Sequence, residues 1–77
     1  MNLSQLHKGD KGVITKINAD KVLKTRFYSF GVYKGARFEI ITCSLTKSTM
    51  ELKVGNTMIA LRRDEVEKIE VEQNDEK

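Results

Sequence analysis

The sequence predicts a mainly β fold, a small five-stranded barrel with one short α-helix after the first strand and a helical turn before the last. Three observations lead to this prediction. Several short segments alternate apolar and polar residues, turns that contain glycine separate them, and one segment follows helical spacing instead. The chain has 77 residues and no linker, so we expect a single domain over residues 1–72 and a polar, frayed tail at 73–77.

The first strand and the helix are expected in the first half of the chain. Val13–Ile17 is mostly β-branched and bounded by turn residues, which favours a strand. The helix is predicted over Lys21–Phe30, and Gly31 follows where a helix commonly ends in the left-handed conformation. The apolar positions of this helix share one face, which we expect to point to the core: Leu23, Phe27 and Phe30.

The second half is predicted to be β. The expected strands are Ala36–Cys43, Met50–Val54, Thr57–Leu61 and a last one around Ile69–Val71. In the first of these, strict alternation puts Phe38, Ile40 and Thr42 on one face. A helical turn is expected at Arg62–Val66, and such a turn before the final strand is typical of SH3-like barrels. Five short strands are too few for a sandwich, so a partly open SH3-like barrel is predicted.

The composition argues against an enzyme, a metal protein or a disulfide-stabilised domain. A single cysteine, Cys43, excludes an internal disulfide, and with one histidine, His7, it falls short of the roughly four ligands of a structural zinc site. No phosphate-binding loop and no converging set of catalytic groups is recognisable. The glutamates near the end of the chain are typical of a solvated acidic face. We therefore predict no catalytic residue, cofactor, metal or small-molecule substrate.

The sequence also predicts a cytoplasmic protein. No stretch approaches the roughly 20 apolar residues that cross a bilayer, and residues 1–12 lack the apolar core of a signal peptide. A free cysteine is common in the reducing cytoplasm. A membrane is expected to matter only through a partner.

Charge is distributed unevenly along the chain. Residues 1–63 carry twelve basic and four acidic side chains, a net +8, whereas residues 64–77 carry a net −5. No acid interrupts the segment from residue 21 to residue 37, in which aromatic residues lie among basic ones. The candidate partner-binding residues are Lys24, Arg26, Tyr28, Tyr33, Lys34, Arg37 and, near the closing turn, Arg62. Each of these residues has an alternative role that involves no partner: the charged ones can simply be solvated, and the aromatic ones can cover the core. Arg26 has the specific alternative of a salt bridge to Glu65 or Glu67.

The order of these motifs resembles the FeoA family, small cytoplasmic proteins of bacterial ferrous iron uptake. The run Arg26–Gly35 resembles the helix end and turn of that family, with Lys34 where the family usually has proline. Gly55 followed by Ile59–Arg62 resembles its later glycine and its apolar-alanine-leucine-arginine segment. The resemblance extends from residue 3 to residue 71.

The resemblance implies an SH3-like accessory protein of the membrane ferrous iron permease, which carries a cytoplasmic GTP-binding domain. The implied partner is that cytoplasmic domain. A small basic nucleic-acid-binding or regulatory module remains the alternative, because basic residues that lie among aromatic residues can also bind single-stranded nucleic acid. A ferrous iron carrier is less favoured, because its usual imidazole and carboxylate ligands are not near one another in the sequence. We expect a monomer or a weak homodimer, with the open strand edges guarded by outward charges at Glu51, Lys53, Glu70 and Glu72.

Overall fold

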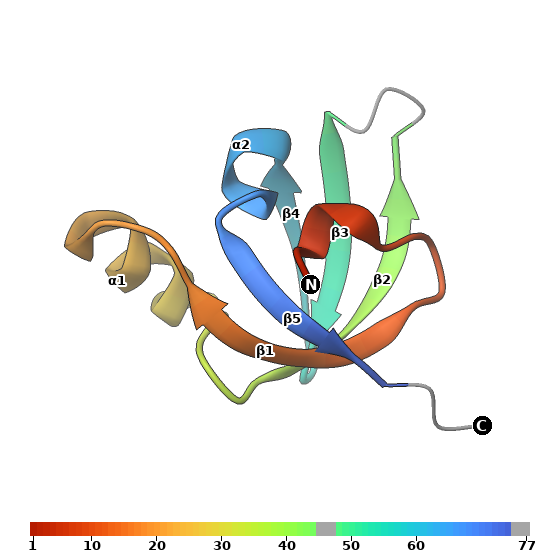
Figure 1. Cartoon of the computed structure of the whole chain (residues 1–77), viewed down its shortest axis with the longest axis horizontal. Helices are drawn as coiled ribbons and strands as arrows, with labels where there is room; N and C mark the ends of the chain where they lie inside the picture. Colours follow the sequence, from red (N-terminus) through yellow and green to blue (C-terminus); the bar gives the residue numbers. More distant parts are fainter. Residues whose placement is uncertain (45–47, 75–77) are drawn as a thin grey trace.

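The computed structural model describes residues 1–44 and 48–74 of the chain. Within these ranges the elements are η1 (Leu3–Gln5), β1 (Lys11–Ile17), α1 (Lys21–Ser29), β2 (Arg37–Cys43), β3 (Thr49–Val54), β4 (Thr57–Arg62), α2 (Arg63–Val66) and β5 (Ile69–Gln73) (Figure 1). The five predicted strands, the helix after the first and the helical turn before the last are therefore confirmed. The predicted tail at 73–77 lies partly outside the described residues, and Gln73 is the last residue of β5.

The strands form one antiparallel sheet in the order β4-β3-β2-β1-β5. The sheet curves strongly around the core, and η1 and α2 lie over its open side (Figure 1). The predicted barrel is open, since no strand pairing joins β4 to β5 in the part of the chain that the structure describes. None of the helices in this part is long and apolar enough to cross a membrane.

The core lies inside the curve of the sheet. Each strand contributes residues from its inner face, and the segment around η1 adds Leu3 and Leu6. The largest fully buried side chains are Phe27, Leu3, Ile14, Ile40, Leu52, Leu61, Ile69 and Val32. Because these come from every part of the chain, the core ties both termini and the helix to one cluster.

Helix α1 stands out from the sheet (Figure 1). Phe27 and the half-buried Leu23 pack it against the core. Asp20 caps the helix start by accepting a hydrogen bond from the Leu23 amide at 2.8 Å. Phe27 is 0% exposed, whereas Leu23 is only half-buried. The prediction that Phe30 belongs to the core face is wrong: its side chain is 39% exposed, because the helix ends at Ser29 and the backbone turns away there.

The helix ends in a Schellman motif that directs the chain back to the sheet. Gly31 adopts a φ of +86°, the left-handed conformation that the sequence predicts. The Val32 amide donates to the Phe27 carbonyl at 2.8 Å, and the Gly31 amide donates to the Tyr28 carbonyl at 3.0 Å. Val32 is fully buried, so this turn has the apolar contact that usually accompanies it.

Two β-bulges change which side chains face the core. In β2 the register shifts between Ile40 and Thr42, so Ile41 is an extra residue. Thr42 is therefore exposed, and its hydroxyl donates to the Glu51 carboxylate at 2.8 Å. Strict alternation, which put Thr42 on the face of Phe38 and Ile40, is wrong beyond this bulge. In β1 a second shift lies between residues 14 and 16.

The outward charges do not guard both edges of the sheet as expected. Glu51 and Lys53 lie on β3, which is an interior strand between β2 and β4. Only Glu70 and Glu72 lie on an edge strand, β5. The other edge, β4, carries no charged residue from Thr57 to Leu61.

Candidate functional site

A groove of about 500 Å³ lies between α1, the turn that follows it and the end of β1. We call it the lysine–tyrosine groove. Its lining residues are Thr15, Lys16, Ile17, Lys24, Tyr28, Val32, Tyr33 and Lys34. The groove thus combines three lysines, two tyrosines and an apolar floor, and none of its eight lining residues is acidic.

The helix and its terminating turn position the two tyrosines. Lys24 and Tyr28 are four residues apart in α1 and therefore lie on the same side of the helix. The Schellman turn then brings Tyr33 beside Tyr28, with 5.3 Å between the ring centroids and an interplanar angle of 44°. The turn is anchored to β1, because the Gly35 amide donates to the Ile14 carbonyl at 2.7 Å. The aromatic wall of the groove is therefore fixed by backbone contacts at both ends.

The bulge in β1 brings Lys16 to the groove. Strict alternation would put Lys16 on the same face as Ile14, which is buried. The extra residue at the bulge leaves both Thr15 and Lys16 exposed. Lys16 is absent from the predicted site residues because the sequence of β1 contains no signal for a bulge at this position.

The three lysines of the groove have no described partner of opposite charge. In the described ranges, no ion pair or hydrogen bond involves the side chain of Lys16, Lys24 or Lys34. All three are exposed, whereas Ile17 is half-buried and Val32 fully buried beneath them. The groove is therefore suited to a ligand that has negative charge and an apolar group.

The structure brings together four of the seven predicted site residues. Lys24, Tyr28, Tyr33 and Lys34 line the groove. The other three predicted residues, Arg26, Arg37 and Arg62, do not. Arg37 lines a separate hollow of about 350 Å³ near Gly12 and Glu72, and Arg62 is the last residue of β4, immediately before α2.

Arg26 forms the salt bridge to Glu65 that the sequence offered as an alternative to partner binding. Its Nη1 lies 3.2 Å from Oε2 of Glu65, whose side chain is only 10% exposed. The second oxygen of Glu65 accepts a hydrogen bond from the Arg62 amide at 2.9 Å. Glu65 therefore connects α1 to the start of α2.

Replacing Arg26 with methionine is expected to lower the free energy of unfolding by about 1–2 kcal/mol, because it leaves the buried Glu65 carboxylate without its cation. Arg26 is itself 60% exposed, which limits the loss. Arg63→Met is the matched control, because the 3.4 Å pair of Arg63 with Glu67 is exposed on both sides and is expected to contribute less than about 0.5 kcal/mol. Urea denaturation measures both, and equal losses would contradict the role of Glu65.

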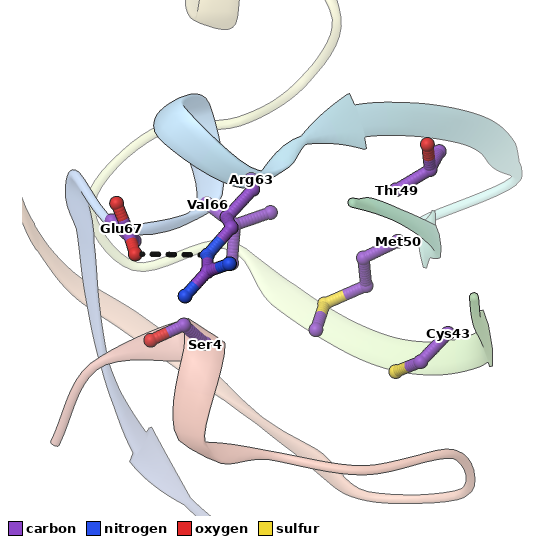
Figure 2. A pocket seen from close by; sticks show the side chains of 7 residues that line it. All are labelled: Ser4, Cys43, Thr49, Met50, Arg63, Val66 and Glu67. Atoms are coloured by element: carbon purple, nitrogen blue, oxygen red, sulfur yellow. Dashed lines mark hydrogen bonds and ion pairs between the residues drawn. The ribbon is translucent and has the colours of Figure 1, made fainter. Parts of the chain in front are cut away.

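A second hollow of about 270 Å³ lies between η1, α2 and the adjoining ends of β2 and β3 (Figure 2). In Figure 2 Arg63 and Glu67 meet on one side, while the sulfur-containing side chains of Cys43 and Met50 lie on the other. Its two charged residues neutralise each other. In the described part of the chain, no three His, Cys, Asp or Glu side chains form a group that could hold a metal ion. This hollow is therefore a weaker candidate than the lysine–tyrosine groove.

The family of the chain follows from comparison with known proteins. The model of the FeoA domain family matches residues 1–73. The chain belongs to the FeoA family. This family comprises small accessory proteins of iron transport, so the prediction that the chain is not an enzyme is confirmed, and membership supports a role in ferrous iron transport.

Three FeoA relatives illustrate the range of the similarity. A Campylobacter jejuni protein named as an Fe(2+) transport protein A is 38% identical over 71 residues, which cover 92% of this chain and 96% of that protein. A Porphyromonas gingivalis protein named as a fusion of Fe(2+) transport protein A with the Fe(2+) transporter FeoB is 31% identical over 72 residues. This match covers 94% of this chain and 8% of the fusion protein.

The third relative is a crystal structure of FeoA from Stenotrophomonas maltophilia complexed with zinc, described as a prokaryotic SH3 domain protein. It superimposes with a TM-score of 0.79 at 24% identity, covering 94% of this chain and 89% of that chain. At this identity the likeness concerns the fold alone. It confirms the predicted SH3-like class.

Proposed function

We propose that this chain is a cytoplasmic accessory protein of ferrous iron uptake that docks onto the cytoplasmic GTP-binding domain of the membrane ferrous iron permease. The fusion protein of P. gingivalis supports this proposal, because it joins an FeoA segment and an Fe(2+) transporter in one polypeptide. Such a fusion holds the two parts at high local concentration, which favours an interaction between them.

The docking surface in this proposal is the lysine–tyrosine groove. The observation that carries it is the convergence of three exposed lysines without described ionic partners on two contacting tyrosines. Tyrosine is enriched at protein interfaces because it provides a large apolar area and a polar hydroxyl. The partner segment that fits this chemistry is acidic and carries an apolar side chain that packs against the exposed tyrosine rings.

Reversing two charges of the groove tests the proposal. Lys24→Glu/Lys34→Glu is expected to weaken binding to the permease domain about tenfold or more, because attraction becomes repulsion at two points. The matched control is Lys8→Glu/Lys11→Glu, which makes the same change in net charge at two exposed lysines outside the groove. Isothermal titration calorimetry measures the affinities. Equal losses from the two double variants, or no loss from the first, would contradict the assignment of the groove.

A nucleic-acid ligand is the alternative that the same experiment separates. The two tyrosine rings contact each other, with 5.3 Å between centroids, and leave no space for a base between them. Affinity for a short single-stranded DNA that falls steeply with salt, without affinity for the permease domain, would favour the nucleic-acid function instead.

A further inference from the structure

The edge strand β4 has an unusual combination of properties for the edge of a sheet. It pairs with β3 on one side, and it is the terminal strand of the sheet. Most of its residues are exposed, and Met58 is 53% exposed. It carries neither a charge between Thr57 and Leu61 nor a proline. Proteins commonly protect an edge strand with such residues or with a bulge, and β4 pairs with β3 in continuous register.

Hairpin geometry shows which backbone groups of β4 are available. The two-residue turn at 55–56 makes Val54 and Thr57 the first hydrogen-bonded pair. Hydrogen-bonded pairs alternate along an antiparallel ladder, so the amides and carbonyls of Met58 and Ala60 point away from β3. No backbone hydrogen bond to another described residue occupies them. The edge therefore presents two donors and two acceptors at the spacing of a β-ladder.

We propose that β4 pairs antiparallel with β4 of a second copy of this chain, with the twofold axis at Ile59. In this register Met58 forms a hydrogen-bonded pair with Ala60 of the other copy, and each residue uses both of its outward backbone groups. Ile59 lies opposite its own counterpart in a non-hydrogen-bonded pair, in which side chains approach most closely. The two sheets then continue into one.

The side chains favour this self-pairing. On the outer face, Met58 is next to Lys53 of β3 and Ala60 is next to Glu51. Each cross-strand row of the dimer therefore runs from Lys53 through Met58 and Ala60 to Glu51 of the other copy, with opposite charges at its two ends. The two Arg62 side chains lie at opposite ends of the paired strands, about 20 Å apart at 3.3 Å per residue. No like charges face each other, and the large Met58 meets the small Ala60.

The dimer is expected to be weak. One short strand from each copy buries little area, so the dissociation constant is expected on the order of 0.1–1 mM. No residue of β4 lines the lysine–tyrosine groove, so dimerisation leaves the groove residues unpaired.

Two double variants with charges at the same positions test the pairing. Met58→Glu/Ala60→Glu puts glutamates opposite each other in both rows and is expected to abolish the dimer. Met58→Glu/Ala60→Lys puts a glutamate opposite a lysine in both rows and is expected to keep or strengthen it. Because residues 58 and 60 are exposed, both variants should keep the fold of the monomer, which thermal melting checks.

Sedimentation equilibrium from about 10 µM to about 1 mM measures the association of all three proteins. We expect the wild type and the Glu/Lys variant to dimerise with rising concentration, and the Glu/Glu variant to stay monomeric. A wild type that is monomeric at about 1 mM would overturn the proposal. So would a dimer that both double variants weaken equally, because antiparallel pairing about Ile59 puts like charges opposite each other in one variant and opposite charges in the other.

Discussion

Replacing Phe27 with alanine is expected to lower the free energy of unfolding by about 3–5 kcal/mol, which is the usual cost of removing a buried aromatic ring. Among the described residues of α1, Phe27 is the only fully buried side chain, and it joins the helix to the core. A domain of this size has a total stability of only about 5–10 kcal/mol, so the variant should be partly unfolded at physiological temperature. Urea denaturation followed by circular dichroism measures the loss.

The control for this prediction is Phe30→Ala. The Phe30 ring is not in the core, and its centroid lies 5.8 Å from Cζ of Arg26. Phe30 is 39% exposed, so we expect a loss of about 1 kcal/mol or less. Similar losses for the two variants would contradict the distinction between the buried and the exposed ring. Phe27→Leu keeps most of the apolar volume and should fold. Under the docking proposed above, it should bind the permease domain more weakly, because α1 is less firmly held.

Replacing Gly12 with alanine is expected to destabilise the fold by about 3 kcal/mol through a steric clash. Gly12 lies in β1 opposite Gln73 of β5. A Cβ atom there would overlap the backbone carbonyl oxygen of Glu72 and lie 3.0 Å from Cζ of Phe38. Backbone on one side and a buried ring on the other cannot both move away without separating β1 from β5.

Gly9→Ala provides the comparison for Gly12→Ala. Gly9 has a φ of +91°, and no described atom lies within 4 Å of the position that an alanine methyl group would take there. Its variant therefore meets only the backbone strain of the left-handed conformation, at a cost of about 1–2 kcal/mol. Hydrogen exchange separates the two causes. Gly12→Ala should speed exchange of the β1 and β5 amides, whereas Gly9→Ala should leave that ladder protected. A Gly12→Ala protein with wild-type protection would contradict the predicted clash.

The fold was predictable because local signals and the global architecture agree. Glycines mark the turns, alternation marks the strands, and the spacing that ends at Gly31 marks the helix. Thr42 was predicted on the wrong face for a physical reason. A bulge interrupts the alternation of side chains between the two faces of a strand, and nothing in the local sequence marks it. Phe30 was wrongly predicted to face the core, because helical spacing does not show at which residue the helix ends.

The candidate site was partly predictable. Lys24, Tyr28, Tyr33 and Lys34 come from one continuous segment, so their proximity follows from the helix and its turn. Lys16 could not be assigned, because it joins them only through the β1 bulge and the tertiary fold. The three predicted arginines lie outside the groove, and their role in binding stays a prediction. The sequence offered a salt bridge of Arg26 to Glu65 or Glu67 as an alternative, and the fold shows that the partner is the buried Glu65. Only the fold shows that Arg37 lines another hollow.

Docking through the lysine–tyrosine groove can be followed residue by residue in an NMR titration of the isotope-labelled chain with the cytoplasmic GTP-binding domain of the ferrous iron permease. The titration measures the chemical shift of each backbone amide, and a short single-stranded DNA serves as the control ligand. We predict saturable shifts at the groove residues of β1, α1 and the following turn with the permease domain, and none with the DNA. Shifts that spare the groove, such as changes limited to the hollow beside Cys43 and Arg63, or shifts with the DNA alone, would contradict docking through the lysine–tyrosine groove.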